Sequence, residues 1–285
     1  MVEGSLVLEG GSLRCLFTAG VLDVFMEQGI ELSNVIGVSA GSLSGINYVS
    51  KQIGRTAKVN IDYVNDPHYL GFRNLIKSQH SVFNFDFLFG EITDTLVPLD
   101  KEAFFQSKQK IEFVVTNCET GKEEYIGRDD MEDPLLAARA SASMPLLSPR
   151  VVIENQHYLD GGIAMPIAYQ RAIDEGHQKI VLVLTREDGY RKQEQSKAIL
   201  HAYRRVYREY PELIKKLEQI PNHYNEMQEE ISKLEKEGRV FIIRPDEPVL
   251  VSRMEKDVSK LQALYKSGRR IATERLQALQ DYLEV

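Results

Sequence analysis

The chain has 285 residues, a net charge of −7 and 43% hydrophobic residues, which is ordinary for a globular protein of one large or two smaller domains. The negative charge argues against general nucleic-acid binding, because affinity for duplexes depends on neutralising phosphates. The chain has neither an apolar run long enough to span a membrane nor the basic start of a secretory signal, so we expect a cytoplasmic protein. Cys15 and Cys118 lack metal-site spacing and are too few for a disulfide framework, which fits small core residues in a reducing compartment.

The N-terminal part alternates between short apolar strands and amphipathic helices. Residues 5–9 read as a buried strand, and residues 12–29 show helical spacing of apolar side chains. A second strand over 33–39 is followed directly by a second helix beginning at Ala40. This β-α-β-α order predicts an α/β fold with a parallel sheet and right-handed crossovers.

Aromatic residues crowd into the next segment, over residues 60–95. Seven of the 13 tyrosines and 11 phenylalanines lie between Tyr63 and Phe89. Four of them alternate along the chain, at Phe83, Phe85, Phe87 and Phe89. Such a stretch forms either a lid or part of the core, and the sequence leaves both interpretations open.

The second half of the chain divides by composition. Residues 110–128 read as two strands joined by a turn, and residues 179–187 as another buried strand. After Tyr190 the chain consists of charged amphipathic helices interrupted by one short strand. We therefore predict an N-terminal α/β domain over 1–188 and a charged, mostly helical region over 189–285.

One part of this C-terminal region is basic. Between Tyr190 and Ile220, eight Lys or Arg residues face four Glu residues and are interleaved with Tyr203, Tyr207 and Tyr210. Such a face can rest on an anionic membrane surface, with tyrosines at the level of the headgroups. A solvated helix whose tyrosines pack on the body of the protein gives the same pattern.

The stretch IGVSAGSLSG places Ser39 between Gly37 and Gly41, where a predicted strand gives way to a predicted helix. G-x-S-x-G suits a nucleophile elbow, because the sharp turn requires residues without bulk on either side of the exposed hydroxyl. A serine that caps a helix is the alternative. The strand before Ser39 and the helix after it favour the catalytic interpretation.

A serine hydroxyl becomes a good nucleophile only when a base accepts its proton. None of the six histidines lies in a context that suggests this base, including His157, which precedes an apolar pair. Asp160, in the stretch HYLDGG, ends a short strand before two glycines, so its carboxylate can project from a turn into a pocket. An ordinary hairpin turn is the alternative.

Residues 8–14, LEGGSLR, form a third candidate element. Gly10 and Gly11 between a strand and a helix allow successive backbone N–H groups to point into one small space, where they stabilise negative charge. This arrangement fits an oxyanion hole or a phosphate loop. The glycine spacings of nucleotide-binding motifs are absent here, which favours the oxyanion hole.

Three motifs in this order, EGGSLR, GVSAG and ASASMPLLSP followed by LDGG, closely resemble the patatin-like phospholipase family, here of bacterial type with a C-terminal helical extension. The resemblance spans roughly residues 5–185. It implies a three-layer α/β sandwich around a mostly parallel sheet. It also implies hydrolysis of lipid acyl esters by a serine–aspartate dyad, without a metal or other cofactor.

By this resemblance, Ser39 is the nucleophile and Asp160 the carboxylate of the dyad, while the backbone of Gly10, Gly11 and Ser12 forms the oxyanion loop. Asp160 is then expected to accept the serine proton, and a site that desolvates this carboxylate raises its proton affinity. The helix that starts after Ser39 favours the negative charge on its oxygen.

Two positions depart from the family pattern. Ser12 stands where the family has the third glycine, and Cys15 stands where a glycine follows the usual arginine, which is Arg14 here. If the Ser12 position requires positive φ, its side chain costs about 1 kcal/mol or more of strain. The backbone N–H group survives the change.

The substrate pocket is expected near Ser39. Candidates for an apolar acyl slot are Phe83, with the alternating phenylalanines up to Phe89, and Met144, Leu146 and Leu147, although structural core residues show the same pattern. Arg14 either binds a phosphate headgroup or pairs with an acidic neighbour.

The resulting hypothesis is a cytoplasmic serine acyl hydrolase of lipase, phospholipase or lysophospholipase type, with a lipid or acyl ester as substrate and possible peripheral contact with a membrane. The alternative is a catalytically weak or inactive relative that binds lipid or acyl chains for regulation, suggested by Ser12 and Cys15. The sequence predicts no nucleic-acid partner and indicates no particular oligomeric state.

Overall fold

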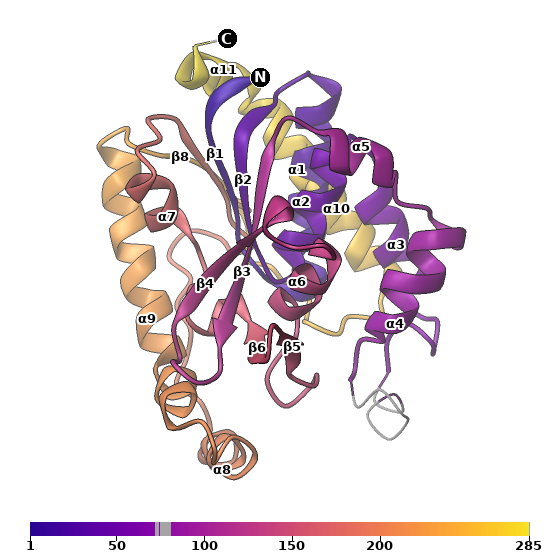
Figure 1. Ribbon diagram of the computed structural model, residues 1–285. Coiled ribbons are helices and arrows are strands. Elements are labelled where there is room, and N and C mark those ends of the chain that lie inside the picture. Colours follow the sequence, from indigo (N-terminus) through magenta and orange to yellow (C-terminus); the bar gives the residue numbers. More distant parts are fainter. Residues whose placement is uncertain (72–73, 75–80, 285) are drawn as a thin grey trace.

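A single mixed β-sheet runs through the molecule, seen nearly edge-on in Figure 1. The computed structural model describes residues 1–71, 74 and 81–284. The strand order is β5-β6-β3-β2-β1-β7-β8, and β4 pairs with β3 off this path. The strands are β1 (Val2–Leu8), β2 (Leu32–Val38), β3 (Lys110–Asn117), β4 (Glu123–Gly127), β5 (Val151–Ile153), β6 (Gln156–Asp160), β7 (Ile180–Val183) and β8 (Phe241–Ile243).

Five neighbouring strands, from β3 through β2, β1 and β7 to β8, pair in parallel, whereas the pairs β3–β4, β3–β6 and β5–β6 are antiparallel. The mostly parallel sheet predicted from the sequence is therefore confirmed. The strands expected over 5–9, 33–39, 110–128 and 179–187 all lie in this sheet.

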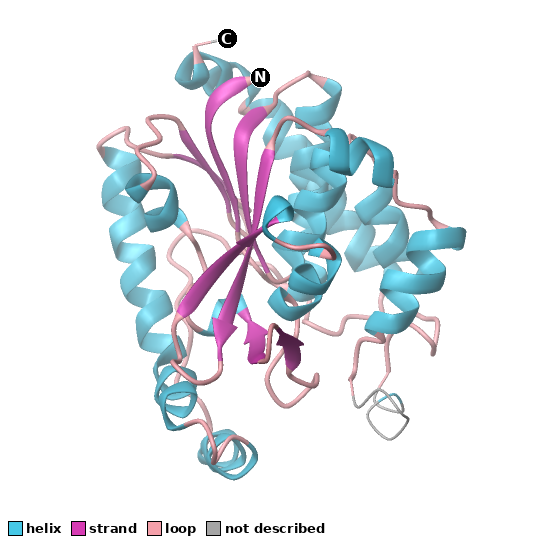
Figure 2. Cartoon of the chain, in the orientation of Figure 1, coloured by secondary structure: helices cyan, strands magenta, loops and turns pink. Residues whose placement is uncertain are grey.

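Helices cover both faces of the sheet and complete the three layers, as Figure 2 shows. Helices α1, α2, α3 and α10 lie on one side, and α7 and α9 on the other (Figure 1). The helices are η1 (Ser12–Cys15), α1 (Leu16–Glu27), α2 (Ala40–Val49), α3 (Arg55–Tyr63), α4 (Phe85–Phe87), the π-helix η3 (Leu88–Leu96), α5 (Lys101–Gln106), η4 (Arg128–Asp130), α6 (Pro134–Ser141), η5 (Gly161–Ile163), α7 (Tyr169–Asp174), α8 (Lys197–Val206), α9 (Pro211–Lys236), α10 (Val258–Glu274) and α11 (Leu276–Leu283).

Each face of the sheet has its own hydrophobic core. Successive side chains of a strand point to opposite faces, so Leu6 and Leu8 of β1 belong to the core beneath α1, while Val7 belongs to the core beneath α7 and α9. Both faces are buried, which explains why the central strands read as continuous apolar runs rather than as alternating ones.

Residues 189–285 share the sheet and cores of the N-terminal part. The strand β8 extends the sheet beside β7, and α10 packs along α1. The Tyr265 hydroxyl donates to the Asp23 carboxylate at 2.6 Å, and Arg269 pairs with Glu27 at 2.8 Å. The division into two domains at residue 188 stays a prediction. In the structure, the residues on either side of this division pack extensively against each other.

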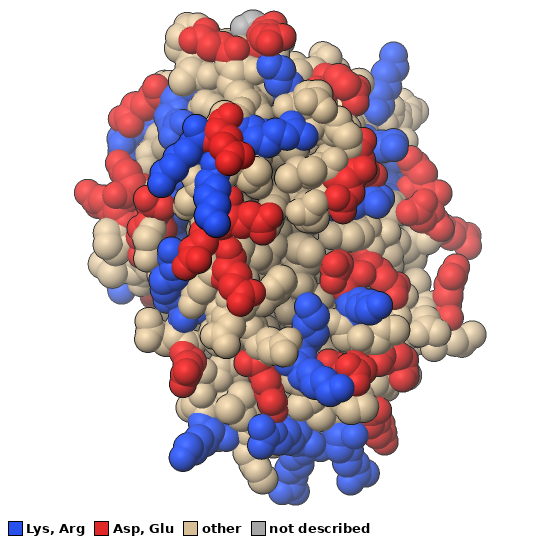
Figure 3. All heavy atoms as spheres, turned by 90° about the vertical axis from the view of Figure 1, so that its left-hand side faces the viewer, with Lys and Arg blue, Asp and Glu red and all other residues tan. Residues whose placement is uncertain are grey.

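The basic face between Tyr190 and Ile220 corresponds largely to α8 and the start of α9. Tyr203, Tyr207 and Tyr210 are buried in a small cluster with apolar side chains of α9. Lys and Arg side chains gather at the lower end of the face in Figure 3, and the exposed basic residues of α8 and its flank are Lys197, Arg204, Arg205 and Arg208. The tyrosines thus pack on the body of the protein, as in the second of the two interpretations of this segment.

The aromatic segment belongs partly to the core. Phe83 and Phe85 are 8% and 4% exposed and pack in the core beneath α1. Residues 72–73 and 75–80 of this segment, with His80 among them, lie outside the described residues.

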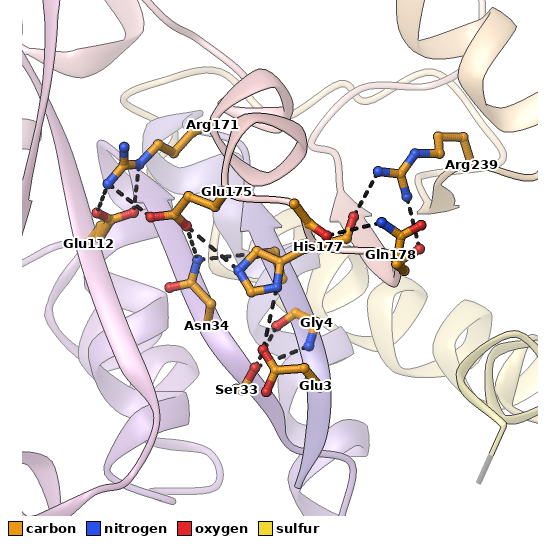
Figure 4. A network of polar contacts seen from close by, with 12 residues as sticks. Glu3, Gly4, Ser33, Asn34, Glu112, Arg171, Glu175, His177, Gln178 and Arg239 are labelled. Carbon is orange, nitrogen blue, oxygen red and sulfur yellow. Dashed lines mark hydrogen bonds and ion pairs between the residues drawn. The ribbon is translucent and has the colours of Figure 1, made fainter.

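A polar network joins α7 to the sheet near the amino ends of the parallel strands (Figure 4). Arg171 donates to both carboxylate oxygens of Glu112, at 2.6 and 3.2 Å, and also pairs with Glu175 at 3.0 Å. Glu175 in turn accepts from the Asn34 amide at 3.0 Å. This network stabilises one end of the sheet and leaves the carboxyl ends of the strands, at the other end, for the site described next.

Candidate active site

Ser39 occupies a sharp turn between β2 and α2. Its φ of 55° and ψ of −126° lie in a region that non-glycine residues rarely adopt. The flanking glycines allow close backbone approach: a Cβ atom on Gly37 would lie 2.5 Å from the Ser42 Cα atom, and one on Gly41 would lie 2.4 Å from the Leu8 carbonyl oxygen. The G-x-S-x-G spacing therefore follows from close packing of Gly37 against the start of α2 and of Gly41 against the end of β1.

The Ser39 hydroxyl donates a hydrogen bond of 2.6 Å to the Asp160 Oδ2 atom. The two residues are 121 positions apart, and the strand order brings them together. Ser39 follows β2, Asp160 ends β6, and both strands flank β3, where Asp160 pairs with Val115. The two side chains that the sequence analysis singled out are thus in direct contact.

Asp160 is held firmly and is largely removed from water. Its Oδ1 atom accepts a hydrogen bond from the Gly162 N–H group at 2.7 Å, and the residue as a whole is only 7% exposed. Burial raises the pKa of Asp160 above its usual value, while the hydrogen bonds from Ser39 and Gly162 oppose this effect. The carboxylate is therefore a stronger base than an ordinary aspartate.

The backbone of Ser39 is fixed by a residue that the sequence analysis did not single out. The Ser39 N–H group donates to the Ser141 hydroxyl at 2.9 Å, and this hydroxyl also contacts the Ser42 hydroxyl at 2.9 Å. Ser141 ends α6, within the stretch ASASMPLLSP that contributed to the family resemblance. The stretch ASASMPLLSP therefore contained a signal that Ser141 belongs near the active site, but it did not indicate the contact between Ser141 and the Ser39 N–H group.

The loop of Gly10, Gly11 and Ser12 lies beside Ser39. A Cβ atom on Gly10 would lie 2.9 Å from the Cβ atom of Ser39. Within the described ranges, the N–H groups of Gly11 and Ser12 donate to no protein acceptor, so both are available to a ligand. Ser12 has a φ of 53°, so this position does require positive φ, and its side chain costs about 1 kcal/mol or more of strain.

Two cavities meet at Ser39. The larger, of about 400 Å³, is lined by Ser39, Asp160 and the Gly10–Ser12 loop and extends toward the C-terminal region. The smaller, of about 50 Å³, has Ser39 at one end and is lined mostly by apolar side chains, Phe83 among them, together with a few polar ones such as Ser44 and Asn60. Ser12, Ser39 and Met144 line both cavities, so the serine hydroxyl lies where the two join.

Most of the predicted substrate-binding residues border these cavities. Met144 lines both, Phe83 lines the smaller cavity, and Arg14 lines the larger cavity. Leu146 borders neither of them: it packs in the tyrosine cluster beneath α8, and its N–H group donates to the Tyr207 hydroxyl at 2.8 Å. The sequence analysis missed three cationic side chains of the larger cavity, Arg186, Lys192 and Arg253, which carry no motif.

Comparison with known families agrees with the fold. A model described as patatin-like phospholipase matches residues 6–173, more than half of the chain. The protein therefore belongs to the patatin-like phospholipase family, a family of lipid hydrolases. A second model, a domain of unknown function named DUF6363, matches residues 210–284.

Individual relatives are distant. The chain is 25% identical over 278 residues to the uncharacterized protein YjjU of Escherichia coli K12, a match that covers 93% of this chain and 74% of that protein. The structure of VipD from Legionella pneumophila aligns with a TM-score of 0.51 at 14% identity, covering 98% of this chain and 67% of that one. This likeness supports the patatin-like fold. Among the helices in the described ranges, none has the length and apolar composition needed to cross a membrane.

Proposed function

We propose that this protein is a serine acyl hydrolase that cleaves carboxylic esters of lipids through Ser39 and Asp160. The observation that carries the proposal is the 2.6 Å hydrogen bond between the Ser39 hydroxyl and the Asp160 carboxylate, at the mouth of two cavities. A nucleophile in contact with its base, next to free backbone donors, is the arrangement that acyl transfer requires.

In the first half of the reaction, Asp160 accepts the hydroxyl proton while the Ser39 Oγ atom attacks the ester carbonyl carbon. The carbonyl oxygen becomes negative and is stabilised by the N–H groups of Gly11 and Ser12. The positive end of α2, which begins directly after Ser39, also favours this charge. When the tetrahedral intermediate collapses, the alcohol leaves with the proton from Asp160, and the acyl group remains on Ser39.

In the second half, a water molecule attacks the acyl-enzyme ester, and Asp160 accepts the proton of this water. The same N–H groups stabilise the second oxyanion. Collapse releases the carboxylic acid and returns the proton to Ser39. The raised pKa of Asp160 helps both halves, because a more basic carboxylate removes the proton more readily.

The proposal is tested by measuring hydrolysis of short-chain p-nitrophenyl esters by Ser39→Ala and Asp160→Asn variants. Each is expected to lose more than about a thousandfold in kcat/KM, because residues that act as a unit fail together. Asp62→Asn is the matched control, since Asp62 is an exposed carboxylate on α3. Thermal unfolding curves establish that each variant is folded.

Labelling with a fluorophosphonate probe separates the enzyme from the alternative of an acyl-binding relative without turnover. Stoichiometric labelling of Ser39 in the folded wild-type protein supports catalysis. A folded protein that is neither labelled nor able to hydrolyse esters contradicts the proposal. Full activity in either dyad variant contradicts the assigned roles.

A further inference from the structure

The oxyanion loop of Gly10, Gly11 and Ser12 is built from residues that do little to fix their own conformation. Two of the three are glycines, and glycine loses more conformational freedom on folding than any other residue. The N–H groups of Gly11 and Ser12 stabilise an oxyanion only if they already point to the place where the charge develops. Contacts from outside the loop must therefore supply its rigidity.

The C-terminal region contacts this loop on both sides. The Tyr224 hydroxyl donates to the Oε1 atom of Glu9, the residue before the loop, at 2.8 Å. The Ser12 hydroxyl donates to the Arg253 carbonyl oxygen at 2.7 Å. Tyr224 and Arg253 both lie within residues 210–284, the part of the chain that matches the domain of unknown function. That part of the chain therefore holds the loop at its start and at its end.

Glu9 and Thr185 form a chain of hydrogen bonds that leads to the loop. Glu9 is only 4% exposed, and its Oε2 atom accepts from the Thr185 N–H group at 2.6 Å. The Thr185 hydroxyl donates to the Gly10 carbonyl oxygen at 3.0 Å. A Cβ atom on Gly11 would lie 2.8 Å from the same hydroxyl oxygen. The loop is therefore packed closely against the segment that follows β7.

Tyr224 is itself fixed by its surroundings. The residue is 1% exposed, its hydroxyl accepts from the Gln228 amide at 3.1 Å, and the Lys192 ammonium lies 4.0 Å from the centre of its ring. It belongs to α9, which lies on the opposite face of the sheet from α2 (Figure 1). A similar hydrogen bond, from the Tyr169 hydroxyl to Glu230 at 2.6 Å, joins α7 to α9, and neither of these two residues borders the cavities at the site.

We propose that the region of residues 210–284 holds the oxyanion loop in its working conformation, and that Tyr224 is a positioning residue that acts through Glu9. This inference rests on the proposed function, in which the N–H groups of Gly11 and Ser12 stabilise the oxyanion. It gives the C-terminal region a role in catalysis, although this region supplies neither the nucleophile nor the base.

The physical reason is the buried charge of Glu9. Without the Tyr224 hydroxyl, the Glu9 carboxylate has one hydrogen-bond donor fewer, and a buried charge that loses a partner is strongly destabilised. The side chain then moves toward other donors or water. Glu9 is joined directly to Gly10, so this movement shifts the N–H groups of the loop. A displacement of about 1 Å at a catalytic group can cost about a hundredfold in rate.

The first test compares Tyr224→Phe with the matched control Tyr169→Phe in hydrolysis of p-nitrophenyl butyrate. Each variant keeps the ring and loses one hydroxyl that donates to a glutamate. In Tyr224→Phe, kcat is expected to fall by about tenfold or more and KM to change by less than about twofold, because the loop acts in the transition state. Tyr169→Phe should keep the wild-type kcat. An unchanged kcat in Tyr224→Phe, or an equal loss in both variants, overturns the inference.

Inhibitor binding reports on the oxyanion loop directly. An octyl trifluoromethyl ketone adds to the serine hydroxyl and gives an adduct with a negative oxygen, whereas decan-2-one, the matching methyl ketone, resembles the ground state. Tyr224→Phe should raise the inhibition constant of the trifluoromethyl ketone by about tenfold or more and leave that of the methyl ketone unchanged. If both inhibitors weaken equally, Tyr224 affects ground-state binding and does not position the loop.

Thr185 provides a second test, which also applies if Tyr224→Phe fails to fold. Thr185→Val has nearly the same size and lacks the hydroxyl that donates to Gly10, whereas Thr185→Ser keeps a hydroxyl. Thr185→Val is expected to lower kcat by about tenfold, and Thr185→Ser should stay within about threefold of the wild-type value. Equal losses in the two variants contradict the inference, because the hydroxyl would then not hold the loop.

Hydrogen exchange separates this inference from the proposed function, because it requires no turnover. The Glu9 N–H group donates to the Val183 carbonyl oxygen at 3.1 Å, and the Arg14 N–H group to that of Gly11 at 3.2 Å. A peptide covering residues 7–16 should exchange faster in Tyr224→Phe than in the wild-type protein, and at the wild-type rate in Tyr169→Phe. Unchanged exchange in Tyr224→Phe overturns the inference even if esters are hydrolysed. If no ester is hydrolysed and the exchange changes as expected, the proposed function fails while the positioning of the loop by Tyr224 is supported.

Discussion

The backbone strain at Ser39 can be measured by comparing two substitutions. Its φ of 55° and ψ of −126° are unfavourable for a residue with a Cβ atom. Ser39→Ala and Ser39→Gly both remove the hydroxyl group that donates to Asp160, and only the glycine also removes the Cβ atom. The difference in unfolding free energy between the two variants therefore reports the strain.

The expected difference follows from two opposing terms. Relief of the strain stabilises the glycine variant by about 1–3 kcal/mol. The greater freedom of glycine in the unfolded chain costs about 0.4–1 kcal/mol. The glycine variant should therefore be more stable than the alanine variant by about 1 kcal/mol, or roughly 2–4 °C in Tm.

Chemical denaturation and differential scanning calorimetry at neutral pH measure this difference. Ala263→Gly is the control, since Ala263 is exposed in the middle of α10, where glycine should destabilise by about 1 kcal/mol. If Ser39→Gly is no more stable than Ser39→Ala, the turn is not strained as its backbone angles indicate, and the explanation of the G-x-S-x-G geometry is wrong.

Four further predictions concern Asp160, Gly41 and the two cysteines. Burial raises the pKa of Asp160 above the ordinary value of 3.8. As the pH is lowered, esterase activity should therefore be lost at a pH above 3.8, and a pH profile of kcat/KM measures this. A raised carboxyl pKa in the folded state means that the ionised form destabilises the fold at neutral pH, so Asp160→Asn should unfold at an equal or higher temperature than the wild-type protein. Gly41→Ala would place a Cβ atom 2.4 Å from the Leu8 carbonyl oxygen and should cost about 1–3 kcal/mol in denaturant titrations, together with most of the activity. Cys15 and Cys118 are buried, and burial raises the pKa of both thiols, that of Cys118 to about 12, so neither should react with a thiol reagent until the protein is unfolded.

Local patterns were enough to single out Ser39, Asp160 and the Gly10–Ser12 loop as candidate site residues. Ser39 and Asp160 each stand at the end of a strand beside glycines, and such turns are determined by a few neighbouring residues. The same holds for the Gly10–Ser12 loop. The 2.6 Å contact between Ser39 and Asp160 depends on β6 and β2 both flanking β3, and the residue patterns did not indicate this strand order.

The sequence patterns did not predict the cationic side chains that line the larger cavity. Arg186, Lys192 and Arg253 are separated along the chain and follow no spacing, and lysines and arginines in charged segments usually belong to a solvated face. Leu146 is a residue that the sequence predicted in the substrate pocket and the structure places elsewhere. Although it is close to Met144 in sequence, it packs against the tyrosine cluster and not against a cavity.

The sequence by itself determined the alternation of strands and helices, the mostly parallel sheet and the turns that display Ser39 and Asp160, because hydrophobic period and turn chemistry act over a few residues. The tertiary structure decided that β8 and α10 pack against β7 and α1, and that Lys192 and Arg253 of the C-terminal region line the larger cavity. The reason is that contacts between distant segments depend on how complete surfaces fit together, and this fit is not encoded in any short stretch.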